Sequence, residues 1–223
     1  MKSDMNLMMP YDIATKIDDA GIIAVLVIDE LKHALPLAEA LLKGGVDTVE
    51  LTLRTPIAFD AAIAIKKEFP EIVLGFGTLI TIDQISKVVD AGADFAVAPG
   101  CNPRIIVEAK NQGLPFAPGI MTPSDIELAI ELGCQILKYF PAETSGGLKN
   151  LESMVAPYQY LGLKFIPLGG LSLENSANYL KSPLITAIGG SWLAKSQLIK
   201  DEQWNTITKN ALEIKNLIKE IKH

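Results

Sequence analysis

The stretch SDIELAIELGCQILKYFP, residues 124–141, contains one complete helix-to-strand unit of the chain. Its first half has apolar residues three and four positions apart, which predicts a helix over Ser124–Leu132, and Pro123-Ser124-Asp125 is typical of a helix start. Gly133 follows as a helix-ending residue. The second half, Gln135–Phe140, is short, apolar and rich in aromatic residues, which predicts a buried strand that ends at a proline.

This unit recurs along the chain. The same order of helix end, short loop and next strand is found in GGVD at 44–47, AGAD at 91–94 and LGCQ at 132–135. The opposite strand ends are also alike, with glycine or proline–glycine at 75–77, 98–100, 117–119, 169–170 and 189–190. Eight such units without a break in composition favour a closed (β/α)8 barrel, the TIM barrel, over an open doubly wound sheet. We expect residues 1–223 to form this α/β barrel as a single domain.

The element boundaries follow from the same patterns. The expected strands are Ile22–Ile28, Thr48–Leu53, Ile72–Phe76, Phe95–Ala98, Pro115–Pro118, Gln135–Phe140, Lys164–Leu168 and Ile185–Ile188. The expected helices between them are Leu31–Leu42, Ala58–Phe69, Ile82–Val89, Arg104–Lys110, Ser124–Leu132, Leu148–Val155 and Glu174–Leu180. An extra helix is expected at Tyr11–Ala20, and the amphipathic, lysine-rich tail Glu202–His223 is expected to be the last outer helix.

Composition argues against several classes of protein. The chain of 223 residues is 49% hydrophobic and carries a net charge of −6 with dispersed basic residues, which speaks against nucleic-acid and anionic-membrane binding. No apolar stretch approaches the roughly 18 residues of a membrane span. Met1–Met5 contains an early acid and begins no apolar segment, unlike a secretory signal. Cys101 and Cys134 lack metal-ligand spacing, so we expect reduced thiols in a cytoplasmic protein.

Histidine is nearly absent. The two histidines are His33, within an expected helix, and His223. They offer no Ser-His-Asp or Cys-His constellation and no histidine-rich metal site. We therefore expect metal-free chemistry that is carried by lysine and carboxylate groups.

Lys138 is unusual because it lies inside the predicted buried strand Gln135–Phe140. Burial disfavours the charged form of an amine, and a neutral amine in an apolar pocket forms Schiff bases with carbonyl substrates. The alternative is a lysine whose ammonium group reaches water or pairs with a carboxylate. Lys138 taken alone leaves both interpretations open.

The expected strand Thr48–Leu53 carries polar residues on one face. Alternation along a strand places Glu50, Thr52 and Arg54 on one side and apolar residues on the other. Because the apolar side should pack on the helices, the three polar residues are expected to point into the barrel, as is Lys138. Buried charges require partners. An ion-pair network that only stabilises the barrel would explain the same pattern.

Glycine pairs follow the seventh and eighth expected strands. Gly169-Gly170 and Gly189-Gly190-Ser191 occupy the two loops that form the usual phosphate site of such barrels. Glycine lets backbone N–H groups approach an anion, and a short helix expected to begin at Ser191-Trp192 would direct its positive end at that anion. The two loops therefore predict a phosphate site, although tight turns also use glycine pairs.

Seven segments carry a resemblance to a known family. In chain order they are Leu51-Thr52-Leu53-Arg54, Gly77-Thr78, Ala98-Pro99-Gly100, Pro118-Gly119-Ile120, Lys138-Tyr139-Phe140-Pro141-Ala142-Glu143, Gly169-Gly170 and Gly189-Gly190-Ser191-Trp192. Together they resemble the 2-keto-3-deoxy-6-phosphogluconate (KDPG) aldolase and 4-hydroxy-2-oxoglutarate (KHG) aldolase family. The resemblance runs from about Gly21 to Lys195, and its most specific part is KYFPAE at 138–143.

The resemblance implies a metal-independent class I aldolase without a cofactor, from the bacterial Entner–Doudoroff route. Such an enzyme cleaves the phosphorylated keto-deoxy sugar acid KDPG to pyruvate and glyceraldehyde 3-phosphate. Many family members also cleave KHG to pyruvate and glyoxylate. Members are typically homotrimers, so a homotrimer is implied for this chain as well.

The resemblance also implies roles for individual residues. Lys138 corresponds to the Schiff-base lysine, and Glu50 corresponds to the general acid and base. The implied binding residues are Arg54 and Thr78 for the pyruvate carboxylate, Pro99 and Phe140 for the pocket walls, and Gly169, Gly170, Gly190 and Ser191 for the phosphate.

Two positions depart from the family pattern. Leu168 stands where many relatives have threonine, which leaves open the C4 epimer, 2-keto-3-deoxy-6-phosphogalactonate, as the substrate. Phe76 replaces a small residue and is expected to face either the helices or the pocket. Two other functions also stay open: a sugar-phosphate isomerase or epimerase, which needs a carboxylate pair or a metal, and a non-catalytic phosphosugar-binding barrel.

Overall fold

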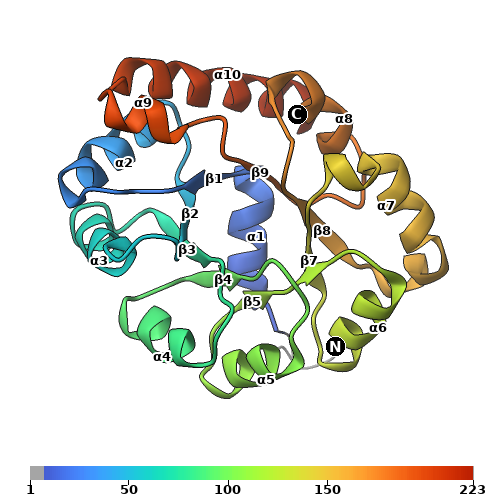
Figure 1. Ribbon diagram of the computed structural model, residues 1–223. Coiled ribbons are helices and arrows are strands. Elements are labelled where there is room, and N and C mark those ends of the chain that lie inside the picture. Colours follow the sequence, from blue (N-terminus) through green and yellow to red (C-terminus); the bar gives the residue numbers. More distant parts are fainter. Residues whose placement is uncertain (1–7, 223) are drawn as a thin grey trace.

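The computed structural model describes residues 8–222 as a ring of parallel strands enclosed by helices (Figure 1). The strands are β1 Ile22–Leu26, β2 Thr48–Thr52, β3 Val73–Gly77, β4 Phe95–Val97, β5 Phe116–Ala117, β6 Gly119–Ile120, β7 Ile136–Tyr139, β8 Lys164–Pro167 and β9 Ile188–Gly190. Met1–Met5, where the sequence predicts no secretory signal, and His223 lie outside the described residues.

Two hydrogen-bonded sheets, in the orders β5-β4-β3-β2-β1-β9 and β6-β7-β8, make up the ring. β5 and β6 are consecutive pieces of one strand, interrupted at Pro118, which has no N–H to donate to a ladder. At the other junction Phe165 of β8 forms a parallel bridge with Ile185, just before β9. Both ends of the two sheets therefore meet, and the predicted (β/α)8 barrel is confirmed.

Helices connect successive strands and form the outer layer of the ring. They are α2 Ala34–Lys43, α3 Ala58–Glu68, α4 Asp83–Asp90, α5 Pro103–Asn111, α6 Pro123–Glu131, α7 Gly147–Val155, α8 Leu173–Leu180, α9 Ser196–Lys200 and α10 Trp204–Lys222, with the short 3-10 turns η2 Leu31–His33, η3 Glu143–Ser145 and η4 Ala156–Leu161. Among the described residues, 8–222, no helix is both long enough and apolar enough to cross a lipid bilayer.

Helix α6 shows how the opening sequence unit folds. Pro123 occupies the first helical turn, where its missing N–H costs nothing. Thr122 and Asp125 form a capping box, in which the Asp125 N–H donates to the Thr122 hydroxyl and the Thr122 N–H donates to the Asp125 carboxylate at 2.8 Å. Residues Leu132–Gln135 then turn the chain into β7, as the repeated pattern predicts.

The predicted extra helix, α1 Tyr11–Ala20, fills one end of the barrel. Figure 1 places it at the centre of the strand ring. Its buried residues Ile13 and Ile17 belong to the apolar cluster inside the barrel. The other buried members of that cluster are Met9, Ile23, Val73, Phe95, Val97, Ala117, Ile136, Ile166, Leu168 and Ala187.

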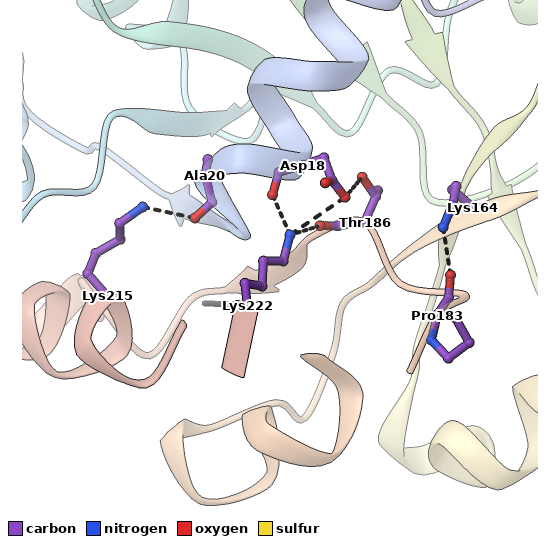
Figure 2. Close-up of polar contacts among 7 residues, drawn as sticks. All are labelled: Asp18, Ala20, Lys164, Pro183, Thr186, Lys215 and Lys222. Atoms are coloured by element: carbon purple, nitrogen blue, oxygen red, sulfur yellow. Dashed lines mark hydrogen bonds and ion pairs between the residues drawn. The ribbon is translucent and has the colours of Figure 1, made fainter. Parts of the chain in front are cut away.

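Two lysines of α10 donate hydrogen bonds to the last turn of α1. Figure 2 shows Lys215 donating to the carbonyl oxygen of Ala20 at 3.0 Å and Lys222 donating to the carbonyl oxygens of Asp18 and Thr186. The Thr186 hydroxyl also donates to the Asp18 carboxylate at 3.0 Å. The last carbonyl groups of a helix lack partners within the helix, so these lysines satisfy acceptors that would otherwise stay open.

Candidate active site

A buried ion pair lies inside the barrel, between β2 and β7. Glu50 Oε1 and Lys138 Nζ are 3.2 Å apart, and their side chains are only 2% and 7% exposed. Strand alternation explains the orientation, because the flanking Val49, Leu51, Leu137 and Tyr139 point outward into the apolar layer beneath the helices. The structure therefore brings together the two residues with implied catalytic roles.

Gly77 makes room for the Glu50 carboxylate. A Cβ atom at position 77 would lie 1.7 Å from Oε1 and 2.5 Å from Cδ of Glu50. β2 and β3 pair in register, with Thr52 opposite Gly77, so the inward faces of the two strands are adjacent. Every residue other than glycine at position 77 would displace the carboxylate from its place beside Lys138.

Pro99 and Phe140 flank the lysine. The Nζ atom of Lys138 lies 5.6 Å from the centroid of the Phe140 ring, within the range of a cation–π contact. A Cβ atom at Gly119, which pairs with Lys138 across β6 and β7, would lie 2.3 Å from the backbone of Pro99. Both Pro99 and Phe140 are half-buried, so they line the boundary between the barrel interior and solvent.

The position of Arg54 differs from the prediction. β2 ends at Thr52, and the Arg54 N–H donates to the Thr52 carbonyl oxygen at 2.8 Å, which turns the chain away from the strand direction. The Arg54 side chain is exposed, so its expected burial inside the barrel is wrong. It nevertheless lies at the carboxyl end of the strand that carries Glu50.

Thr78 has a strained backbone. It follows Gly77 directly and adopts a left-handed conformation with φ of 67°, which is rare for a β-branched residue. Such conformations gather at functional sites, where the surrounding structure holds them. Thr78 is half-buried, at the carboxyl end of β3.

The glycine loops after β8 and β9 lie on neighbouring strands. Gly169 and Gly170 have φ values of 97° and 80°, which favour glycine. Gly190 ends β9, and Ser191 is exposed immediately after it. The helix expected to begin at Ser191-Trp192 is not there, because residues 191–195 form bends and turns and α9 begins at Ser196.

The structure also places the two departures from the family pattern. Phe76 points outward, where its ring lies 5.3 Å from that of Phe59, so it does not narrow the barrel. Leu168 points inward and is 5% exposed. A Cβ atom at Gly189 would lie 2.2 Å from Cγ of Leu168, so the leucine fills space that glycine leaves on the neighbouring strand.

Sequence reasoning missed the steric roles of Gly77 and Gly189, which depend on distances between strands. It also gave no role to Glu143, the last residue of the KYFPAE segment. Within residues 8–222, no group of three or more His, Cys, Asp or Glu side chains is arranged to hold a metal ion.

Comparison with known proteins decides the family. A model of the family described as KDPG and KHG aldolase matches residues 13–210 of the chain. The chain belongs to this family. It is 36% identical over 207 residues to the 2-dehydro-3-deoxy-phosphogluconate aldolase of Haemophilus influenzae, covering 93% of this chain and 97% of that protein. It is 40% identical over 192 residues to the KHG/KDPG aldolase of Escherichia coli K12, covering 86% and 89%.

Solved structures of family members share the fold of this aldolase. The KDPG aldolase of Legionella pneumophila superimposes with a TM-score of 0.85 at 36% identity, covering 89% of this chain and 96% of that chain. That structure holds pyruvate as a covalent carbinolamine intermediate. The predicted family and the predicted enzyme class, a carbon–carbon lyase, are confirmed.

Proposed function

We propose that this chain cleaves KDPG to pyruvate and glyceraldehyde 3-phosphate through an imine on Lys138. The observation that carries the proposal is the buried pair of Lys138 and Glu50, with a nucleophilic nitrogen and a proton-transferring oxygen 3.2 Å apart. The covalent carbinolamine in the Legionella relative supports the same chemistry. An isomerase or epimerase would not require a lysine at this position.

The proposed reaction begins when the Lys138 amine, uncharged after giving its proton to Glu50, attacks the C2 carbonyl carbon of the substrate. Glu50 then protonates the carbinolamine hydroxyl, which leaves as water and yields an iminium ion. As a base, Glu50 next takes the proton of the C4 hydroxyl, the C3–C4 bond breaks and the aldehyde leaves. The resulting enamine gains a proton at C3, and water hydrolyses the pyruvate imine and restores the amine.

The remaining candidate residues would hold the substrate. The exposed guanidinium of Arg54 and the hydroxyl of Thr78 lie at the ends of neighbouring strands and suit a carboxylate. Pro99 and Phe140 would limit water access to the enamine. The residues proposed for the phosphate are Gly169, Gly170, Gly190 and Ser191.

Two details of the proposal concern substrate range. KHG is a second expected substrate, because the Escherichia coli relative is a KHG/KDPG aldolase. Leu168 projects into the barrel where a threonine hydroxyl would otherwise be available, so the C4 epimer of KDPG should be assayed beside KDPG itself. A rate that favours the epimer would change the assigned substrate but not the imine mechanism.

The assembly is proposed from the family resemblance, and the location from the reduced thiols expected for Cys101 and Cys134. We infer a homotrimer in the cytoplasm that uses no metal or other cofactor. Size-exclusion chromatography with light scattering measures the oligomeric state directly, and a monomer would contradict the trimer.

Borohydride trapping tests the central proposal. Incubating the protein with pyruvate and sodium borohydride should give a stable pyruvate-derived adduct that intact mass detects and peptide mapping places on Lys138. The Lys138→Met variant should give none. An adduct on another lysine, or none on folded wild-type protein, would reject the mechanism.

A further inference from the structure

The loop that follows β8 packs directly on the segment that follows β7. The N–H groups of Ala142 and Glu143 donate hydrogen bonds to the carbonyl oxygens of Leu168 and Gly169 at 2.7 and 3.0 Å. A Cβ atom at Gly170 would lie only 2.6 Å from Cβ of Glu143. The conformation of the Gly169-Gly170 loop therefore depends on where Glu143 lies.

Tyr179 of α8 holds Glu143 in place. Its phenol O–H donates a hydrogen bond to Oε1 of Glu143. Tyr179 is 2% exposed, whereas Glu143 is a surface residue. Burial, and next the hydrogen bond to Glu143, raise the pKa of the Tyr179 phenol. A Cβ atom at Gly147 would lie 3.3 Å from Oε1 of Glu143 and 3.4 Å from the phenol oxygen of Tyr179, so the chain also packs closely over this bond.

Helix α8 holds the loop from its other side through Asn175. The Asn175 amide nitrogen donates to the carbonyl oxygen of Gly170 at 3.2 Å, and its amide oxygen accepts from the N–H of Ser172 at 2.8 Å. Asn175 and Tyr179 are four residues apart, on the same face of the helix. The carbonyl oxygens of Gly169 and Gly170 both accept hydrogen bonds. The N–H groups of the two glycines, in contrast, donate to no acceptor within residues 8–222. Those N–H groups are the part of the loop that suits an anion.

We propose that Tyr179 and Glu143 are positioning residues for the phosphate end of the substrate. By fixing Glu143 against Gly170, their hydrogen bond keeps the Gly169-Gly170 loop in the conformation that binds the phosphate. The inference rests on the proposed function, because it takes that loop as part of the phosphate site. Neither residue takes part in imine formation at Lys138.

Comparing a phosphorylated and a non-phosphorylated substrate tests this role in the Tyr179→Phe variant. KM for KDPG should rise on the order of ten-fold, which corresponds to one hydrogen bond to a charged group. The kcat for KDPG, the KM for KHG and the yield of the borohydride adduct with pyruvate should stay within about two-fold of wild type, because the reacting atoms are unaffected. Inorganic phosphate should also inhibit the variant less strongly than it inhibits the wild type.

Variants of Glu143 keep the inference testable if Tyr179→Phe folds poorly. Glu143→Ala removes the acceptor from the surface side and should reproduce the rise in KM for KDPG. Glu143→Gln retains an amide oxygen that accepts from the phenol and should restore much of the affinity. The double variant Tyr179→Phe/Glu143→Ala should be no worse than either single variant, since all three lack the same bond.

A matched control uses another tyrosine–glutamate pair. The phenol of Tyr158 donates to Oε1 of Glu127 at 2.8 Å, away from the glycine loops. Tyr158→Phe should therefore leave both KM values unchanged. Equal rises in KM for KDPG and KHG in Tyr179→Phe, or no rise in either, would overturn the positioning role. Absence of the wild-type adduct on Lys138 would instead reject the proposed function itself.

Discussion

Replacing Gly77 with alanine should disable Glu50 while leaving the barrel folded. The added Cβ would lie 1.7 Å from Oε1 of Glu50, so the oxygen must move by at least about 1.3 Å to restore a contact of 3.0 Å. That movement breaks the 3.2 Å contact with Nζ of Lys138. The added Cβ clashes with the side chain of Glu50 and not with backbone, so the barrel can still fold, but separating the two buried charges lowers its stability.

The magnitude follows from the role proposed for Glu50. Loss of a positioned general acid and base reduces rates by about 10²–10⁴-fold, equivalent to roughly 3–5 kcal/mol in the activation free energy. Steady-state cleavage of KDPG, monitored through pyruvate release, should therefore fall by at least about 100-fold. The free energy of unfolding should also fall, by up to the roughly 3–5 kcal/mol that is lost when a buried ion pair is broken.

Two comparisons isolate the steric effect. Gly100→Ala is the matched control, because a Cβ atom there meets nothing within 4 Å and the backbone is not left-handed, so both rate and Tm should be unchanged. In the Glu50→Ala background the Gly77→Ala change should cost no further activity, since the obstructed carboxylate is gone. Wild-type kcat/KM in folded Gly77→Ala would refute the reasoning, and so would fully additive losses in the double variant.

Three other changes should separate stability from activity. Lys138→Met should abolish the pyruvate adduct and lower the free energy of unfolding by about 3–5 kcal/mol, because it leaves Glu50 buried without its partner. The double variant Lys138→Met/Glu50→Leu should regain that stability, as measured by urea denaturation, but remain inactive. Lys222→Met removes hydrogen bonds at the end of α1, so it should lower the Tm by roughly 2–6 °C and leave kcat/KM unchanged. An unchanged Tm would show that Lys222 does not stabilise the end of α1. Burial raises the pKa of the Cys134 thiol to about 12 from 9.0, so its contribution to stability is complete below pH 9 and is lost as the pH rises toward 12. Tm measured from pH 8 to pH 11 should therefore fall less steeply in Cys134→Ala than in wild type, and parallel curves would contradict this assignment.

The inward position of Glu50 and Lys138 could be predicted because it depends on strand alternation alone. A period of two along β2 and β7 is enough to turn Glu50 and Lys138 inward, whatever the exact ends of the strands. The same rule failed four residues after Glu50, at Arg54, because it holds only while the chain remains extended, and β2 ends at Thr52. The end of a strand is set by hydrogen bonds to its neighbours, which no local pattern specifies.

The loops proposed for the phosphate were predicted less completely. The glycine pair at Gly169 and Gly170 marked a tight turn, since positive φ values there are a local requirement. The expected helix at Ser191 failed because Leu193 and Ala194 are buried in a turn, and burial of this kind depends on the packing of the whole layer. The Tyr179–Glu143 contact joins residues 36 positions apart and has no sequence signal of its own.

Because α1 closes one end of the barrel, it bears on how the substrate specificity of this protein can be changed. The apolar cluster around α1 fills the barrel from one end, whereas the groups proposed to touch the substrate lie on β2 and β7 and in the loops at the other end. Mutagenesis libraries confined to those loops would alter recognition without opening the packed interior beneath them. Conversely, variants selected for heat tolerance can be sought at the α1–α10 contact without screening each one for a new specificity. Selectivity and robustness are thus separate targets for engineering in this molecule.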